Sequence, residues 1–313
     1  MTAAAALLIA ATNLPGGLPG LTITNGETAI ALPTAEGPRV LAFGPANGPS
    51  LIDGNVSNSV YSDLGVYRIL GGSRMWAAPE EWPATYAPET GPYTVTRLPD
   101  GARVEAGPTT LGWARAITVS LPVHGRAARI VYRLENRART ARTAAPWALT
   151  VPRGPGVALM PAEPVLATGG PLTPLRSLSL WSYTDLADRK YAFGPKLLRV
   201  RVEPSCTSYQ KIGGSVTPGW LGWVSGRSVF VKRSRYDPAA PYPDRGANAE
   251  IYASGNYGEL EMLGPLVRLA PGASATLVEA WAWDELNSDP PTDDEGLLRA
   301  LAPALAAAEA LLP

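Results

Sequence analysis

Two stretches of the chain combine side chain types that bind polar small molecules. The first runs from Gly71 to Glu89, GGSRMWAAPEEWPATYAPE, and contains Arg74, Trp76 and Glu80. Arginine offers a planar fork of donors, tryptophan a flat apolar face and glutamate a pair of acceptor oxygens. Sugars need this mixture, because their hydroxyls bind polar groups and their C–H faces lie on aromatic rings. The competing interpretation places Trp76 and Trp82 in the core and pairs Arg74 with Glu80.

The second stretch, from Tyr209 to Pro265, contains two of the four lysines, Lys211 and Lys232. The other basic residues are 23 arginines, so lysine is not the usual surface charge of this chain. We expect Arg74 and Lys211 to donate to sugar hydroxyls or to a carboxylate in a cleft. Trp76 is the expected stacking platform, and Glu80 and Lys232 are expected to complete the lining.

Three glutamates of the second stretch lie on strand-like runs. Glu259 and Glu261 share a face by the two-residue period of a strand. They are candidates for an acid/base pair or, with backbone carbonyls, for half of a Ca²⁺ site. A solvated face or a structural salt bridge is the commoner outcome for such a pair. Glu250 is the candidate catalytic base if the site performs chemistry, because a base must accept a proton near neutral pH.

Residue counts and missing motifs exclude several other chemistries. One histidine, His124, and one cysteine, Cys206, leave no zinc signature and no internal disulfide. We expect a turn residue and a structural thiol at these positions. No nucleophile elbow, Walker A loop or dinucleotide-binding fingerprint is present. Basic and acidic residues balance at 27 each, which gives no polybasic surface for nucleic acid or for an anionic membrane. We expect no cofactor and no metal, and the oligomeric state stays open.

Strands must position these residues. Short apolar runs such as YTVTRL, AITVSLPV, LLRVRVE and SVFVKR recur between turn residues, and several alternate polar and apolar side chains, as half-buried strands do. The sequence has no strand–helix–strand alternation, so antiparallel sheets are expected. About fifteen such runs exceed the seven to nine strands of an immunoglobulin-type sandwich. The pattern predicts one large all-β sandwich over residues 21–290.

The N-terminal segment, residues 1–20, contains the apolar run AAAALLIAA. This run is too short to span a bilayer, and no basic residue precedes it as in an export signal. We expect a short helix or strand that packs on the body of a cytoplasmic protein that does not enter a membrane. An atypical export signal is the alternative.

The C-terminal segment, residues 291–313, predicts a helix that packs on the same domain. Thr292 and Glu295 match a capping box, and leucines recur on one face from Leu297 onward. Pro303 interrupts this stretch, since it lacks a donor and clashes with the preceding turn. A kink or two short helices are expected there.

Six blocks resemble, in order and spacing, a bacterial family of uncharacterised proteins in the galactose-mutarotase-like superfamily. They are GGSRMWAAPE, APWALTVPRG, KIGGSVTPGW, VFVKRSRYDP, YPDRGANAEIY and ELEMLGPLVRLAPG. The resemblance spans Leu21 to Trp283. It implies a large antiparallel β-supersandwich with a carbohydrate-binding cleft on its concave sheet.

The sequence departs from that family's pattern at two places. Ser73 stands where members typically have histidine, and Glu89 with Thr90 stands where they tend to have Asp-Asn. Aldose mutarotases open the sugar ring with a histidine acid and a carboxylate base. Here the one histidine, His124, lies in another block. The resemblance therefore implies sugar binding without the usual mutarotase mechanism.

Three functions stay open at this point. The first is a carbohydrate-binding protein, with an acidic sugar as one option because both arginine and lysine are expected in the cleft. The second is a sugar epimerase or polysaccharide lyase that uses a carboxylate base and Lys or Arg in place of histidine. The third is a non-catalytic interaction scaffold, which predicts a large exposed apolar patch. Convergence of Arg74, Lys211 and Glu250 in one pocket would argue against the scaffold.

Overall fold

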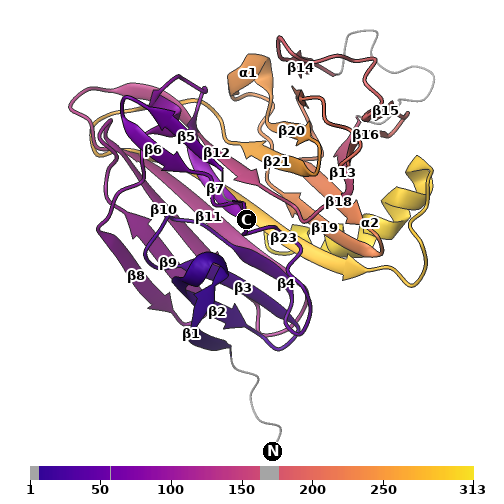
Figure 1. The fold of residues 1–313 in the computed structure, drawn as a ribbon, viewed down its shortest axis with the longest axis horizontal. Helices are drawn as coiled ribbons and strands as arrows, with labels where there is room; N and C mark the ends of the chain where they lie inside the picture. Colours follow the sequence, from indigo (N-terminus) through magenta and orange to yellow (C-terminus); the bar gives the residue numbers. More distant parts are fainter. Residues whose placement is uncertain (1–6, 57, 163–175) are drawn as a thin grey trace, which may run out of the picture.

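Antiparallel sheets make up most of the regular secondary structure in the computed structural model, which describes residues 7–56, 58–162 and 176–313 (Figure 1). The largest sheet has ten strands. In spatial order they are β15 (Tyr191–Phe193), β16 (Leu197–Val202), β13 (Gly156–Pro161), β18 (Trp220–Ser225), β19 (Ser228–Arg233), β23 (Ser274–Glu285), β11 (Ala127–Asn136), β10 (Trp113–Ser120), β9 (Gly101–Ala106) and β8 (Tyr93–Leu98).

A second sheet has seven strands and packs against the first. In spatial order it contains β14 (Leu178–Leu180), β17 (Gln210–Gly214), β20 (Ala249–Ser254), β21 (Tyr257–Leu263), β12 (Arg142–Thr150) and β22 (Val267–Leu269), and β7 (Ser73–Ala78) also pairs with β12. The smaller elements are a four-stranded sheet, a hairpin and three short turns of helix. They are β1 (Leu8–Leu14), β2 (Leu18–Thr24), β3 (Thr28–Pro33), β4 (Ala42–Pro45), β5 (Ser59–Ser62), β6 (Gly65–Arg68), η1 (Pro15–Gly17), η2 (Ala84–Tyr86) and α1 (Pro243–Gly246).

The main hydrophobic core lies between the two large sheets. Strand β21 shows how alternation builds it: Leu260 and Met262 belong to the core, whereas Glu259 and Glu261 point to the opposite face. The ten-stranded sheet contributes buried aromatic residues such as Trp281. The all-β sandwich of large antiparallel sheets predicted from the sequence is confirmed.

The C-terminal helix α2 (Asp294–Glu309) covers the outer face of the ten-stranded sheet, against β19 and β23 (Figure 1). Leu297 and Leu301 are buried there. The capping box expected at Thr292 is wrong, because Asp293 is the N-cap and its side chain accepts from the Gly296 N–H at 2.8 Å. The helix also continues through Pro303 as one segment rather than as two short helices.

The described part of the N-terminal apolar segment contains a strand, β1, whereas residues 1–6 lie outside the described residues. Strand β1 pairs with β2 along its whole length, from Leu8 opposite Thr24 to Leu14 opposite Leu18. The boundary expected after residue 20 therefore falls inside β2. Among the described residues, no helix is long and apolar enough to cross a membrane.

Candidate functional site

The register of the seven-stranded sheet brings the two chemistry-bearing stretches together. Gly213, Glu250, Glu261, Leu149 and Arg74 are directly paired positions on β17, β20, β21, β12 and β7. Paired positions in an antiparallel sheet present their side chains on the same face. One row of side chains therefore crosses five strands on the face that points away from the core.

A second row lies two residues along the same strands. Lys211 on β17 is paired with Tyr252 on β20, which is paired with Glu259 on β21. Gly213 lies two residues after Lys211 on β17. Because it has no side chain, it leaves space above the sheet. A Cβ atom at Gly213 would lie 2.8 Å from Cγ of Glu250, so the missing side chain allows Glu250 to lie across β17.

These rows form the floor of a cleft of about 480 Å³, which we call the main cleft. Its lining has two classes of side chain that matter for chemistry. The charged ones are Arg74, Glu80, Lys211, Glu259 and Glu261, and the aromatic ones are Trp76, Tyr86, Trp147, Tyr183, Tyr209, Tyr252 and Tyr257.

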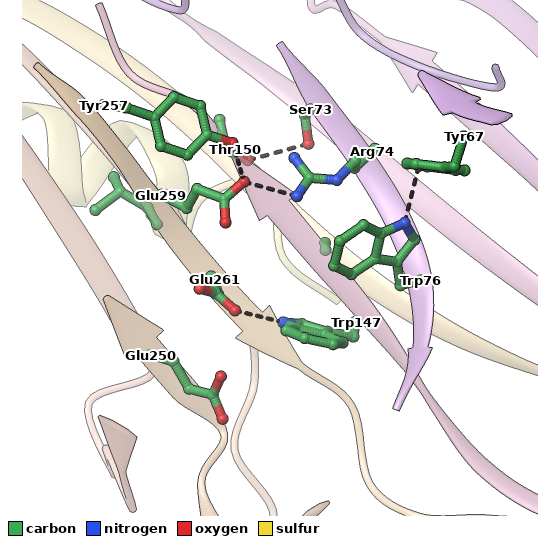
Figure 2. Close-up of polar contacts among 12 residues, drawn as sticks. Tyr67, Ser73, Arg74, Trp76, Trp147, Thr150, Glu250, Tyr257, Glu259 and Glu261 are labelled. Carbon is green, nitrogen blue, oxygen red and sulfur yellow. Dashed lines mark hydrogen bonds and ion pairs between the residues drawn. The ribbon is translucent and has the colours of Figure 1, made fainter. Parts of the chain in front are cut away.

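The first ion pair of the main cleft joins Arg74 and Glu259. Nη2 of Arg74 lies 2.7 Å from Oε1 of Glu259, and the Tyr257 hydroxyl donates to the same oxygen at 2.5 Å (Figure 2). Burial raises the pKa of Tyr257 well above its ordinary value, and the neighbouring Glu259 adds to the shift. Tyr257 therefore stays protonated. Nε and Nη1 of the buried Arg74 make no hydrogen bond.

The second cluster joins one cation to two carboxylates. Nζ of Lys211 lies 2.8 Å from Oε2 of Glu250 and 2.9 Å from Oε2 of Glu261. The Trp147 indole N–H also donates to Oε2 of Glu261 at 2.7 Å (Figure 2). Burial alone lowers the pKa of Lys211, but Glu261 and Glu250 outweigh it and raise that pKa above its ordinary value. The lysine is therefore a fixed cation.

The two carboxylates of this cluster have different positions. Both side chains are fully buried, but Glu250, which pairs with Lys211, is outside the lining of the main cleft. Burial raises its pKa well above the ordinary value, against the opposing effect of Lys211. Glu261 does line the main cleft, burial raises its pKa as well, and its Oε1 has no hydrogen-bond partner. Glu261 is therefore better placed than Glu250 to act on a molecule in the main cleft.

The tryptophans of the cleft floor are largely covered. Trp76 is 4% exposed, its indole N–H donates to the Tyr67 hydroxyl at 2.8 Å, and the guanidinium of Arg74 lies 4.3 Å from its ring centre (Figure 2). Nζ of Lys211 lies 4.6 Å from the Trp147 ring centre in the same way. Both rings form cation–π contacts within the protein, which leaves little of either face for a ligand.

Of the other two expected lining residues, Glu80 lines the main cleft and Lys232 does not. The Glu80 side chain is at the exposed rim of the main cleft, where it accepts from the Tyr86 hydroxyl rather than pairing with Arg74. Lys232 lies outside the main cleft. Its fully buried Nζ is between the sheets, 3.0 Å from Oε1 of Glu279 and 2.9 Å from Oγ1 of Thr150.

The four tyrosines Tyr183, Tyr209, Tyr252 and Tyr257 line the main cleft and are absent from the sequence-based site. Tyr209 is 65% and Tyr183 is 44% exposed, so their rings are accessible to a ligand. Periodicity carries a signal for two of them, since Tyr252 lies two residues after Glu250 on β20 and Tyr257 lies two residues before Glu259 on β21. Tyr183 lies in a loop, where spacing predicts no face.

The two departures from the family pattern lie away from the main cleft. The Ser73 hydroxyl is buried, within 2.8 Å of the Tyr132 hydroxyl and 3.0 Å of the Thr150 hydroxyl. Carboxylate oxygens of Glu89 lie 2.8 Å from Nη2 of Arg39 and 3.7 Å from Nη1 of Arg115. Both positions therefore belong to the packed interior of the structure.

A cation site at Glu259 and Glu261 would need further acidic ligands. In residues 7–56, 58–162 and 176–313, no group of three or more His, Cys, Asp or Glu side chains is arranged to hold a metal ion. Each of the two carboxylates instead has its own basic partner, Arg74 for one and Lys211 for the other.

Solved structures identify the fold, although the sequence matches no family model and no curated protein. A TPR-domain containing protein from Parabacteroides distasonis aligns with a TM-score of 0.56 at 11% identity over 92% of this chain, which spans about 56% of that protein. A putative aldose 1-epimerase from Klebsiella pneumoniae aligns with a TM-score of 0.54 at 12% identity, over 96% of this chain and 87% of the other. A galactose mutarotase-like protein from Lactobacillus casei gives 0.50 at 10% identity, over 85% of this chain and all of the other. The chain has the galactose-mutarotase-like fold that its sequence blocks predict.

Proposed function

We propose that the protein binds a neutral carbohydrate in the main cleft. The observation that carries this proposal is a set of buried polar atoms without protein partners on side chains that line the cleft: Nε and Nη1 of Arg74 and Oε1 of Glu261. Unpaired buried donors and acceptors are costly. Sugar hydroxyls both donate and accept, so a sugar in the cleft offers hydrogen-bond partners of both kinds to these side chains. The mutarotase-like fold supports the same conclusion.

The charges of the main cleft favour a neutral sugar over an acidic one. Arg74 and Lys211 are the cations of its lining, and carboxylates already bind both of them at 2.7 to 2.9 Å. A sugar carboxylate would have to approach Glu259 and Glu261 without a free cation to receive it. Desolvating such an unpaired charge is strongly unfavourable.

The exposed tyrosines supply the stacking surface in this proposal. Trp76 is covered by Arg74, whereas Tyr183 and Tyr209 stand exposed at the cleft wall. Aromatic rings contribute about 0.5–1.5 kcal/mol beyond simple area burial when they contact another flat ring. We take a similar magnitude for a sugar face on Tyr209.

A thermal-shift screen with neutral and acidic monosaccharides and oligosaccharides, followed by calorimetry on any hit, tests the proposal. A ligand that binds only the folded state raises the melting temperature. Tyr209→Ala is expected to weaken binding about three- to tenfold with an unchanged melting temperature, because the ring is mostly exposed. Tyr61→Ala, at a 73% exposed tyrosine outside the cleft, is the matched control. No shift with any sugar would refute the proposal.

A second candidate, exchange of anomers or epimerisation of a bound sugar, is favoured by Glu261 alone. This carboxylate lines the main cleft, has one free oxygen and has a raised pKa, as a general base needs near neutral pH. Proton NMR of a bound sugar would detect anomer exchange above the uncatalysed rate. Glu261→Gln should abolish that excess while Glu250→Gln retains part of it. Arg74 and Lys211 line one cleft whereas Glu250 is outside its lining, so two of the three residues meet the criterion that argues against the scaffold alternative.

A further inference from the structure

A second cavity lies on the other side of the loop that follows β7, and we call it the arginine cavity. Along this loop Glu80 and Tyr86 line the main cleft, whereas Glu81 and Thr85 line the arginine cavity. Its volume is about 110 Å³. Trp113 and Arg115 on β10 and Arg142 on β12 complete the part of the wall that bears on its chemistry.

Arg115 is a buried cation with too few partners. The residue is 4% exposed, and its Nε and Nη1 make no hydrogen bond. Oε1 of Glu89 lies 3.7 Å from Nη1, while the other oxygen of Glu89 is held by Arg39 at 2.8 Å. One carboxylate is thus shared between two guanidinium groups. Buried charges that lack hydrogen bonds are costly, so the site has capacity for another acceptor.

Arg142 faces the same cavity in a fixed orientation. Its guanidinium lies 4.1 Å from the Trp113 ring centre, and its Nη1 donates to the Leu111 carbonyl at 2.7 Å. Burial lowers the pKa of Arg142, and the nearby Glu81 offsets only part of this effect. No carboxylate in the described part of the chain lies within ion-pair distance of this guanidinium.

We propose that the arginine cavity binds a small oxyanion, between Arg115 and Arg142. Guanidinium groups present parallel N–H donors that match the oxygen spacing of phosphate and carboxylate groups. A single water needs roughly 10–15 Å³ of such space, so 110 Å³ has room for an anion of a few heavy atoms. The cavity is much smaller than the main cleft of about 480 Å³.

Glu81 sets the affinity of this site from its edge. Its side chain is exposed and lines the cavity, and its backbone N–H donates to the Thr85 hydroxyl at 2.9 Å. Because no ion pair joins it to Arg142 or Arg115, it does not fill the place of an anion. It does repel one, since like charges close together in a partly buried site disfavour each other.

Calorimetric titration of the full chain with sodium phosphate, at constant ionic strength set by sodium chloride, tests this site. Arg142→Gln should weaken phosphate binding at least tenfold, and Glu81→Gln should strengthen it about two- to fivefold. Arg268→Gln is the matched control: this exposed arginine lies on β22 opposite Thr143, next to Arg142, but outside the cavity lining. It should change binding less than twofold.

A parallel titration with sodium acetate distinguishes the two kinds of oxyanion. Tighter binding of phosphate assigns the site to phosphate groups, and tighter binding of acetate assigns it to carboxylates; both outcomes support an oxyanion site. The proposal is overturned if neither salt releases heat beyond the chloride control. It is equally overturned if Arg142→Gln and Arg268→Gln reduce binding to the same extent. Arg142 is only half-buried, so this test does not depend on a folded Arg115 variant.

Discussion

Replacing Lys211 with methionine removes the single cation that holds two buried carboxylates. The exposed fractions of the side chains are 6% for Lys211, 0% for Glu250 and 1% for Glu261. Methionine fills most of the same volume and adapts to irregular surroundings, so the loss of packing is small. The change therefore isolates the electrostatic contribution of the Nζ group.

The expected loss of unfolding free energy at pH 8 is about 3–5 kcal/mol, the usual cost of leaving a buried charge without its partner. Nζ lies within 2.9 Å of an oxygen of each glutamate. In the variant Glu261 keeps the hydrogen bond from Trp147, whereas Glu250 loses its ion pair. Glu250 is thus the group that takes up a proton.

The loss should shrink as the pH falls. Burial already raises the pKa of Glu250 in the wild-type protein, so the folded state binds this proton more tightly than the unfolded state. A group of this kind adds stability that is present near its unfolded pKa of about 4.3 and lost as the pH rises through its folded pKa. Removing Lys211 raises the folded pKa further. The variant should therefore lose stability between pH 5 and 8 more steeply, by up to about 1.4 kcal/mol per pH unit for one proton.

Urea unfolding followed by tryptophan fluorescence at pH 5.5 and 8 measures both effects through the midpoint at constant m-value. Lys196→Met is the matched control, because its ion pair with Glu295 is exposed on both sides. That change should cost about 1 kcal/mol or less. Adding Glu250→Gln to Lys211→Met should recover part of the loss. A loss below about 1 kcal/mol, or a pH profile parallel to that of the wild type, would refute the reasoning.

Three further changes test other parts of the structure. Lys232→Met should destabilise by about 3–5 kcal/mol, because it leaves the fully buried Glu279 without its cation; a urea midpoint close to the wild type would contradict this. Leu301→Ala should cost about 2–5 kcal/mol of unfolding free energy, since this buried leucine packs α2 against Gly222. Calorimetric unfolding measures the loss, and a stability equal to that of the wild type within error would contradict the packing. Gly213→Ala should cost about 1–3 kcal/mol of unfolding free energy, because the new Cβ would lie 2.8 Å from Cγ of Glu250. The double variant Gly213→Ala with Glu250→Ala should regain most of this loss. An equally unstable double variant would show that the clash lies elsewhere.

The two-residue period predicts much of this site, because it depends only on local geometry. It places Glu259 and Glu261 on one face of a strand, and the structure has both in the lining of the main cleft. It does not predict which strands are neighbours. Arg74 and Lys211 meet only because β7 and β17 belong to one sheet, with three strands between them. That pairing is set by packing over the whole domain.

Lys211 and Lys232 show where local pattern stops being informative. Both lysines lie in strands, and the sequence analysis assigns both to the same cleft. Lys232 shares its face with Phe230, two residues earlier, and Phe230 belongs to the core between the sheets. Lys211 lies on the opposite face of its strand from the core residue Ile212. Lys232 is therefore in the interior because it shares a face with a core residue, whereas Lys211 faces the cleft because it does not. This distinction can be made only when the core-facing side of each strand is known. In the seven-stranded sheet the strand pairing shows it, because Lys211 lies in one row with Tyr252 and Glu259 on the face away from the core.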